Sequence, residues 1–539
     1  MLSTMQDAPL SIARLLTHGS RVHGDAEVVT WTDTGPRRRT YAEVGRRCAA
    51  LAHALRGLGV TGDQRVATFM WNNAEHLEAY LAVPSMGAVL HTLNIRLFPE
   101  QLIHVANHAE DHVIIVDPSL IPLLSPQLPQ LPTVRHVVVT GASTAGLEVP
   151  DGVQVHAYED LISRQPDEYD WPELDERSAA AMCYTSGTTG DPKGVVYSHR
   201  SIYLHSMQVC MSEGPNLSQG DRTLVVVPQF HAMAWGLPYA AFMIGASLIM
   251  PDRFLQPAPL AELIAAERPT FAAAVPTIWQ GLHLHLEQHP QDISSMREVL
   301  IGGSAVPPSL MHTFAQDHNV SVLHAWGMTE TSPLGSVARP PAGATGDEMW
   351  RYRYTQGRFP AAVQARLVDD DTVIPHDGTS IGELEVRGPW ITASYYGGDA
   401  PKKFHDGWLR TGDVGSITPD GYLTLTDRTK DIIKSGGEWI SSVDLENAVM
   451  GHPAVAEAAV IGIPDEKWDE RPLVAVVLRN GSTTTIGELQ QYLSDKVAKW
   501  QLPENWTLIQ EVPKTSVGKF DKKRLRSQYH EGNLDITRL

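Results

Sequence analysis

The sequence has 539 residues, of which 42% are apolar and 19% are charged. This length predicts two or more domains with an ample hydrophobic core, and the composition excludes a largely disordered chain. The formal net charge of −19 disfavours a general surface for nucleic acids or anionic membranes, because both would repel it.

Cysteine usage and the first residues bear on the compartment. The three cysteines form no CxxC pair and no disulfide framework, which indicates a reducing cytosol: Cys48, Cys183 and Cys210. The opening, MLSTMQDAPL, lacks the basic region and apolar core of a secretory signal. We therefore expect a cytoplasmic protein.

One apolar stretch is long enough to cross a bilayer. Residues 223–251 contain no Asp, Glu, Lys or Arg. However, Pro228, His231 and Pro238 interrupt the stretch, and in lipid they would leave polar groups without partners. We expect a buried strand, loop and helix here, and no transmembrane segment.

The first 250 residues alternate predicted helices and strands. Thr40 and Glu43 fit a capping box, and the helix that they begin ends at Gly57 and Gly59. A second helix begins near Ala74. Apolar runs predict strands at residues 65–70, 88–93, 113–116, 137–139, 224–227 and 247–250. This alternation is typical of parallel β-sheet covered by helices.

Residues 184–194, YTSGTTGDPKG, have the composition of a loop that wraps an anion. Their glycines allow close backbone approach, and their hydroxyls and Lys193 add hydrogen-bond donors and positive charge. The loop is not a Walker A motif, because Gly194 follows Lys193 where that motif has Ser or Thr. Predicted strands at 179–184 and 195–196 make a mobile surface loop improbable, so the loop is predicted to bind phosphate.

The character of the sequence changes near residue 428. Residues 427–437, DRTKDIIKSGG, are first charged and then glycine-rich. Beyond them we expect a helix from about Ser442, strands at 455–463 and 473–478, and a helix from Ile486. The remaining length suffices for a small α+β domain. We predict a large domain at 1–428, a hinge linker at 429–434 and a small domain at 435–539.

The phosphate loop and six further motifs, in the same order, resemble the adenylate-forming superfamily of acyl- and aryl-CoA synthetases, firefly luciferase and peptide-synthetase adenylation domains. The further motifs are GGSA (302–305), WGMTE (326–330), GELEVRG (382–388), TGD (411–413), DRTKDIIKSGG (427–437) and PKTSVGK (513–519). VPQFHAMAW (227–235) and KSGGEWISSVDLE (434–446) are most similar to bacterial medium- and long-chain fatty acyl-CoA synthetases. The resemblance implies an α/β fold with a large multi-sheet N-terminal domain and a small mobile α+β C-terminal lid domain.

The resemblance implies a ligase of fatty acid and lipid metabolism that uses ATP, Mg²⁺ and coenzyme A. A carboxylate attacks the α-phosphate of ATP, pyrophosphate leaves, and the resulting acyl-AMP passes its acyl group to the thiol of coenzyme A. Two anions meet in the first step, so the site must neutralise charge and hold both in line.

The residues of the nucleotide site follow by resemblance, motif by motif. The phosphate loop is expected to hold the β- and γ-phosphates through Thr185, Ser186, Gly187, Thr188, Thr189 and Lys193. Thr185 and Glu330 are expected to place Mg²⁺ and Thr329 to contact the α-phosphate. The expected adenine site comprises Gly303, Ser304, Ala305, Trp326, Gly327 and Met328, with Trp326 stacking where many relatives have tyrosine. Asp413 and Arg428 are expected at the ribose.

The small domain is expected to serve both steps. Lys519 is expected to bridge carboxylate and phosphate oxygens in the first step, which suits a compact ammonium. Lys430 matches the hinge about which relatives rotate this domain. After rotation, Gly436 and Gly437 are expected to line the pantetheine tunnel, beside Lys434.

Trp235 matches a residue that gates the acyl tunnel in relatives. Phe230 and His231 are expected beside the carboxylate, and Val275 and Gly302 leave room for an alkyl chain. A short thioether or aryl acid is an alternative substrate.

Two rival hypotheses concern the class of protein. One is an acyl-AMP ligase that loads a carrier protein, which KSGGEWIS and the chain's end twenty residues after Lys519 disfavour. The second is a nucleotide-binding regulator without catalysis, which Lys193, Glu330 and Lys519 together disfavour. The resemblance implies a homodimer formed through the large domain, and the net charge of −19 argues against a nucleic-acid partner.

Overall fold

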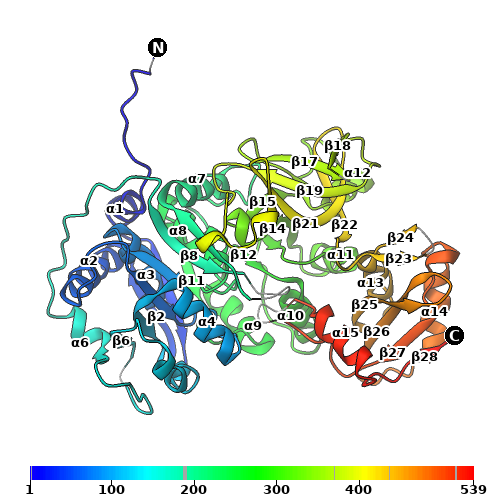
Figure 1. Cartoon of the computed structure of the whole chain (residues 1–539), viewed down its shortest axis with the longest axis horizontal. Helices are drawn as coiled ribbons and strands as arrows, with labels where there is room; N and C mark the ends of the chain where they lie inside the picture. Colours follow the sequence, from blue (N-terminus) through cyan, green and yellow to red (C-terminus); the bar gives the residue numbers. More distant parts are fainter. Residues whose placement is uncertain (2, 142, 186–190, 370, 436–437, 516–518) are drawn as a thin grey trace.

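A computed structural model describes residues 1–539 apart from 2, 142, 186–190, 370, 436–437 and 516–518. In this part of the chain the strands form three sheets (Figure 1). Two sheets belong to a large N-terminal domain, and the third belongs to a small C-terminal domain at one end of the molecule. This is the predicted α/β class.

The first sheet contains the strands that flank the phosphate loop. Its order is β7–β6–β5–β3–β4–β8–β9, and neighbours are parallel except β8 and β9. The bounds are β3 (Arg65–Phe69), β4 (Val89–Thr92), β5 (Asp111–Val116), β6 (His136–Val139), β7 (Gln154–Ala157), β8 (Ala179–Tyr184) and β9 (Gly194–Ser198). The antiparallel pairing of β8 with β9 brings the two ends of the loop together, with Tyr184 opposite Gly194.

The second sheet joins a parallel half to an antiparallel half. Its order is β18–β17–β19–β21–β22–β16–β15–β14–β13–β12–β10–β11–β1–β2, with β20 beside β21. The parallel half and its edge hairpin are β1 (Glu27–Thr32), β2 (Gly35–Thr40), β10 (Arg222–Leu224), β11 (Ser247–Met250), β12 (Phe271–Ala274), β13 (Glu298–Ile301) and β14 (Ser321–Gly327). The antiparallel half is β15 (Leu334–Val337), β16 (Gly357–Arg358), β17 (Gln364–Asp369), β18 (Thr372–Ile374), β19 (Gly382–Arg387), β20 (Phe404–His405), β21 (Trp408–Ile417) and β22 (Tyr422–Arg428).

Helices pack against these sheets (Figure 1). Those of the large domain are α1 (Ile12–Val22), α2 (Tyr41–Gly57), α3 (Ala74–Ser85), α4 (Pro99–Ala109), α5 (Ile121–Leu124), α6 (Tyr158–Ile162), α7 (His199–Cys210), α8 (Leu237–Ile244), α9 (Pro257–Glu267), α10 (Pro276–Gln288), α11 (Pro308–Asp317) and α12 (Gly346–Arg353). None of the described helices is long and apolar enough to cross a membrane.

The small domain has its own sheet and its own core. Its strands are β23 (Ile433–Ser435), β24 (Glu438–Ile440), β25 (Val455–Asp465), β26 (Asp469–Leu478), β27 (Asn505–Leu508) and β28 (Thr537–Arg538), and its helices are α13 (Ser442–Met450), α14 (Ile486–Ser494) and α15 (Lys522–His530). Leu445, Val460, Val474 and Trp506 are buried in one cluster within it. A separate core is what a domain needs to keep its shape when it moves as a unit.

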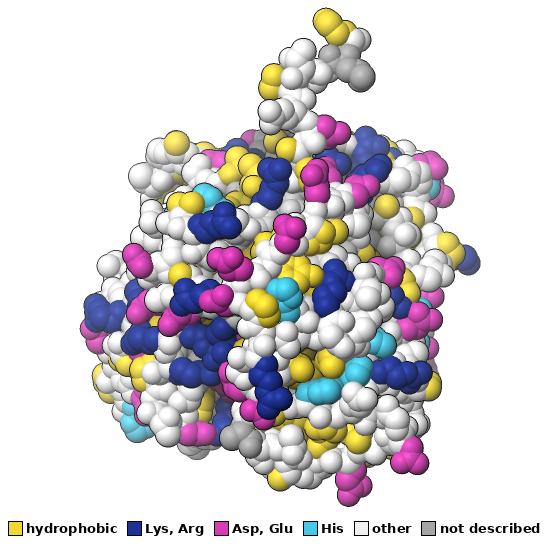
Figure 2. Space-filling model, turned by 90° about the vertical axis from the view of Figure 1, so that its left-hand side faces the viewer, with side chains coloured by type: hydrophobic (Ala, Val, Ile, Leu, Met, Phe, Trp, Pro, Cys, Tyr) yellow, Lys and Arg dark blue, Asp and Glu magenta, His cyan; other side chains and the backbone are white. Residues whose placement is uncertain are grey.

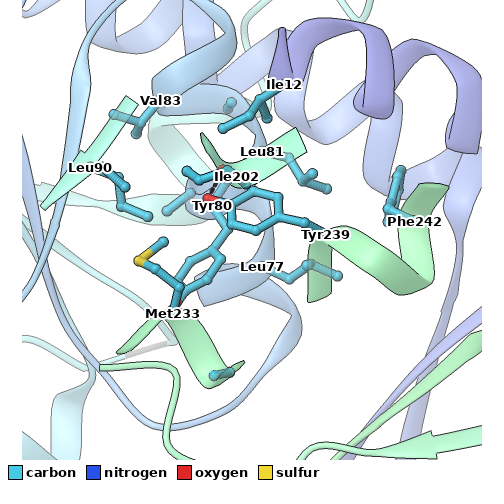
Figure 3. Close-up of a cluster of buried hydrophobic side chains, with 14 of the residues drawn as sticks. Ile12, Leu77, Tyr80, Leu81, Val83, Leu90, Ile202, Met233, Tyr239 and Phe242 are labelled. Atoms are coloured by element: carbon cyan, nitrogen blue, oxygen red, sulfur yellow. Dashed lines mark hydrogen bonds between the residues drawn. The ribbon is translucent and has the colours of Figure 1, made fainter. Parts of the chain in front are cut away.

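A buried cluster in the large domain supports the segment that carries Trp235 (Figure 3). Tyr80 of α3 stacks on Tyr239 of α8 with ring centroids 5.5 Å apart, and the Tyr239 hydroxyl donates to the Tyr80 carbonyl at 3.1 Å. Met233 packs against this cluster from the turn just before α8. Trp235, two residues later, is therefore held in position by the packing of a buried apolar cluster and does not lie on an unsupported loop.

Most of the locally encoded elements are confirmed. Thr40 and Glu43 form the capping box of α2, which ends at Gly57. The strand predicted at 224–227 is wrong in its bounds, because β10 spans Arg222–Leu224 and shares only Leu224 with the prediction. There Asn72 Nδ2 donates to the carbonyls of Val225 and Val227 at 2.7 and 2.8 Å, so these two carbonyls bond to a side chain, while the N–H groups of the same residues still donate to Ile249 and Ala273.

The surface at the α2 and α6 end carries charges of both signs. Figure 2 shows Lys and Arg side chains interspersed with Asp and Glu over this face. Arg47, for example, bonds Glu159 at 2.6 Å and Glu78 at 2.7 Å. Much of the positive charge on this face is therefore paired.

Candidate active site

Two of the cavities between the large and small domains adjoin each other and share lining residues. One has a volume of about 470 Å³ and the other about 240 Å³, and both are bounded by Gly303, Trp326, Arg428 and Lys519. Their floor is formed where β12, β13 and β14 end, which is the edge at which parallel α/β sheets bind ligands. Of the predicted site residues that the structure describes, all but Phe230 and Lys434 line one of the two cavities.

The phosphate side is held by hydrogen bonds across the base of the loop. The Thr185 N–H donates to the Lys193 carbonyl at 3.0 Å, and the Lys193 N–H donates to Thr185 Oγ1 at 3.1 Å. Both residues line the larger cavity. Ser186, Gly187, Thr188 and Thr189, which are also predicted here, lie outside the described residues.

Glu330 is a buried carboxylate on this side of the cavity, with 6% of its surface exposed. Tyr395 donates its hydroxyl proton to Glu330 Oε1 at 2.5 Å, and burial together with that carboxylate raises the pKa of Tyr395. The neighbouring Thr329 carbonyl accepts from the Tyr197 hydroxyl at 2.7 Å. Sequence reasoning missed Tyr395, because it lies outside the motifs and 65 residues from its partner.

Three residues from different strands form one polar cluster on the nucleotide side. Trp326 Nε1, at the end of β14, donates to Asp413 Oδ2 at 2.8 Å. Arg428 Nε lies 3.2 Å from Asp413 Oδ1. Asp413 and Arg428 face each other because β21 and β22 pair in that register. Asp413 is thus an acceptor already fixed in orientation from two sides.

A second residue missed from the sequence, His324, lines the smaller cavity. It is buried, and its Nδ1 has no hydrogen-bond partner in the described part of the chain. Burial lowers the pKa of His324 to about 4, so the ring is neutral at physiological pH. Its position two residues before Trp326 was the only signal that could have indicated it.

Lys519 extends from the small domain into the cavity. Its Cε lies 3.2 Å and its Nζ 3.9 Å from the point where a β-carbon would project from Gly303. Gly303 has a φ of +86°, so a side chain there would be strained as well as crowded. Burial, and then the charge of Arg428, lower the pKa of Lys519 to about 8, against the opposing effect of Asp413 and Glu330.

The acyl side is an apolar extension of the larger cavity. Its far walls are Val209, Pro215, Leu237, Leu300 and Leu334. Residues 232–235 have φ values between 43° and 55°, and this left-handed turn brings Trp235 Cη2 to 3.5 Å from the β-carbon position of Gly302. Burial, with the charges of Lys519 and Arg96, lowers the pKa of His231 to about 3, so His231 is neutral.

Two of the described site residues lie apart from the cavities. Phe230 is buried in a core cluster that includes Phe69 of β3 and Val116 of β5, with the Arg96 guanidinium 5.9 Å from its ring. Lys434 is exposed on β23, and its N–H donates to Glu470 Oε2 at 2.9 Å. Gly436 and Gly437 lie outside the described residues. The small domain therefore presents Lys519, and not Lys434, to the cavity.

Comparisons with known proteins match both domains. The family model of the AMP-binding enzymes matches residues 16–396, and that of the AMP-binding enzyme C-terminal domain matches residues 444–519. The chain is 45% identical over 536 residues to a medium-chain-fatty-acid–CoA ligase of Ectopseudomonas oleovorans, a match that covers 98% of each chain. It is 43% identical over 542 residues to a 3-methylmercaptopropionyl-CoA ligase of Ruegeria pomeroyi, covering 98% of this chain and 99% of the relative.

A long-chain-fatty-acid–CoA ligase of Thermus thermophilus is 45% identical over 536 residues, covering 98% of this chain and 97% of the relative. Among solved structures, the anthranilate CoA ligase AuaEII in complex with anthranoyl-AMP superposes with a TM-score of 0.88 at 26% identity. That match covers 98% of this chain and 100% of the other. The similarity therefore spans both domains and the cavities between them.

Proposed function

This chain belongs to the AMP-binding enzyme family, and from that membership we propose that it is a fatty acid–CoA ligase. It joins a fatty acid to coenzyme A at the expense of ATP. The acid's carboxylate attacks the α-phosphorus and displaces pyrophosphate to give acyl-AMP. The thiolate of coenzyme A then attacks the acyl carbon and displaces AMP.

One observation carries the proposal. Lys519 of the small domain reaches Gly303 of the large domain, and these two residues line both the larger cavity, which Glu330 lines, and the smaller cavity, which Asp413 lines. A nucleotide bound against Gly303 would bring its phosphates to the ammonium of Lys519, where an incoming carboxylate has to approach. A buried ammonium that is charged below about pH 8 offsets the repulsion between the two anions.

The other site residues bind different parts of ATP. Thr185, Lys193 and the loop 186–189 hold the β- and γ-phosphates, and Thr329 the α-phosphate. Trp326 stacks on adenine against residues 303–305, with Gly327 and Met328 behind, and His324 is free to bond the base. Asp413 and Arg428 hold the ribose.

The donors present suit Mg²⁺, which prefers oxygen ligands. The Thr185 hydroxyl and the Glu330 carboxylate both line the larger cavity, and Tyr395 bonds one of the two Glu330 oxygens and leaves the other. With the phosphates of ATP, these oxygens would hold the ion, and its charge would neutralise the leaving pyrophosphate.

The acyl side favours an apolar acid. Six of the described residues that line the larger cavity together with Trp235 are apolar: Val209, Pro215, Leu237, Leu300, Pro333 and Leu334. A terminal carboxylate or ammonium would lose its hydration there without gaining a partner. The neutral His231 bonds the carboxylate, and Val275 and Gly302 line the path of the chain. A short thioether acid, the substrate in the name of the Ruegeria relatives, is the second candidate.

The second step requires another arrangement of the small domain. We place the hinge at Lys430, within the linker 429–434, and the coenzyme A face at Lys434, Gly436 and Gly437. We further propose that the enzyme is a cytoplasmic homodimer. The free thiols of all three cysteines support the cytoplasmic location, and the family resemblance supports the homodimer.

Exchange of labelled pyrophosphate into ATP tests this function. Purified protein with Mg²⁺, ATP and acids of two to eighteen carbons, together with 3-methylthiopropionate and benzoate, is expected to exchange label fastest with a medium- or long-chain fatty acid. Thiol loss on adding free coenzyme A distinguishes a CoA ligase from an enzyme that loads a carrier protein. The absence of exchange with every acid would refute the proposal.

A further inference from the structure

A buried carboxylate of the large domain is bonded to the first turn of a small-domain helix. Asp427, on β22, is 5% exposed. Its Oδ2 accepts from the N–H of Ser442 at 2.8 Å and from the Ser442 hydroxyl at 2.5 Å. Ser442 is fully buried and is the first residue of α13, which lies where the two domains meet (Figure 1). A negative charge at a helix N-terminus is favourable, because the first N–H groups of the helix lack partners within it.

The preceding residues reinforce this contact. The Ser441 hydroxyl donates to the carbonyl of Thr426 at 2.6 Å and accepts from the N–H of Asp444 at 3.0 Å. Two consecutive residues of β22 are therefore bonded to two consecutive residues at the start of α13.

The contact continues from Ser442 toward Lys519. Lys522 Nζ donates to Ser442 Oγ at 2.6 Å and pairs with Glu446 Oε1 at 2.8 Å. The serine hydroxyl has one proton, which it gives to Asp427, and it accepts from Lys522, so every bond is satisfied. Lys522 is the first residue of α15 and follows Lys519 by three residues. A continuous chain of charge-assisted bonds thus runs from Asp427 to the segment that carries Lys519.

Another ion pair between the domains is weaker. Arg479 of the small domain lies 3.6 Å from Glu287 of α10, but their side chains are 36% and 49% exposed. Pairs so exposed contribute little, because water screens them. The Asp427 contact, in contrast, is a buried charged link between the large domain and α13.

We infer that Asp427 is a positioning residue for adenylate formation, because through Ser442 and Lys522 it holds the small domain with Lys519 in the cavity. The inference rests on the proposed function. Asp427 precedes the linker at 429–434 and Ser442 follows it, so rotation about that linker breaks the contact. Asp427 therefore favours the first step and not the transfer to coenzyme A.

The test measures the two half-reactions separately in Asp427→Ala. Pyrophosphate exchange is expected to fall about 10- to 100-fold, the loss typical of a buried hydrogen bond to a charged group. Conversion of supplied acyl-AMP and coenzyme A to acyl-CoA is expected to stay within about twofold of wild type, because that step does not use the contact. Equal losses in both half-reactions, or no loss in either, would overturn the inference.

Two further variants keep the test decisive. Ser442→Ala removes the hydroxyl that joins Asp427 to Lys522 with little change of volume, and it is expected to give the same selective loss even if Asp427→Ala does not fold. Glu488→Ala is the matched control, since Glu488 accepts two bonds at the start of α14, 2.8 and 2.9 Å long, entirely within the small domain. It is expected to change neither half-reaction, and a selective loss in this control would also overturn the inference. If the wild type performs no exchange, the proposed function itself fails, which is a different outcome.

Discussion

The indole nitrogen of Trp326 donates a hydrogen bond to Asp413 Oδ2 at 2.8 Å. Both side chains are almost fully buried, at 6% exposure each. Many members of the superfamily that this sequence resembles have tyrosine at the position of Trp326. The Trp326 indole therefore has two expected roles. It stacks on adenine, and it helps to orient the Asp413 carboxylate, which is proposed to bind the ribose.

Trp326→Phe keeps an aromatic face but deletes the N–H donor together with part of the ring. We expect the KM for ATP to rise about 10-fold, because a buried carboxylate that loses one donor is less well oriented and less well satisfied. The kcat should change less, since the contact is present before and after the chemical step. Steady-state kinetics at saturating fatty acid and coenzyme A measure both values.

Trp279→Phe is the matched control for that change. Trp279 of α10 is fully buried among apolar side chains of the large domain that include Phe314, and its Nε1 has no partner among the described residues. Its replacement should lower thermal stability through the lost volume but leave the KM for ATP unchanged. A similar rise of KM in both variants would show that the Trp326 effect is merely one of core packing.

The depressed pKa of Lys519 predicts an alkaline limit for adenylate formation. With a pKa of about 8, the side chain is charged at lower pH and loses its proton as pH rises through that value. The kcat/KM for pyrophosphate exchange should fall above about pH 8, since this parameter reports free-enzyme pKa values. His231, with a pKa of about 3, should cause no further change of kcat/KM between pH 5 and 8.

The Lys519→Arg variant distinguishes this fall of kcat/KM above about pH 8 from a general loss of activity at high pH. Arginine stays charged throughout this range, although its planar fork fits the site less well. We expect a lower rate overall and no fall near pH 8. An alkaline limb at the same pH in this variant would assign the titration to another group.

Replacement of Trp235 by alanine should relax selection by chain length. The indole lies 3.5 Å from the β-carbon position of Gly302, so its removal widens the passage to Val209 and Pro215. The ratio of kcat/KM between long and medium acids should shift about 5- to 20-fold, an effect of the size expected when one contact in a pocket changes. Trp350→Ala provides the control, because Trp350 lies on α12, which has no fully buried residue, and does not line the larger cavity. A substrate profile identical to wild type would remove Trp235 as the gate.

Local signals in the sequence were sufficient for most elements. The capping box of Thr40 and Glu43 depends on residues three apart, and the strands around the phosphate loop are short apolar runs. The bonds from Asn72 to the carbonyls just after β10 could not be predicted, because Asn72 is 153 residues away from Val225. Such a side chain becomes a partner only after the fold has formed.

The site was predictable to the extent that its residues lie in motifs. The motifs contain Lys519, Glu330 and Asp413, but the bond from Trp326 to Asp413 arises only where the end of β14 meets β21. Tyr395 and His324 were identified only from the structure, in which Tyr395 bonds Glu330 and His324 lines the smaller cavity. No local pattern contained that information.

The proposed chemistry depends most on Lys519 acting in the first half-reaction alone. Lys519→Ala should abolish pyrophosphate exchange while the transfer of a supplied acyl-AMP to coenzyme A continues at close to the wild-type rate. The reason is that Lys519 occupies the cavity in this arrangement, whereas Lys434 lies on the exposed face of β23. Parallel measurement of both half-reactions in one preparation gives the answer. Retention of exchange, or an equal loss of both activities, would contradict this role of Lys519.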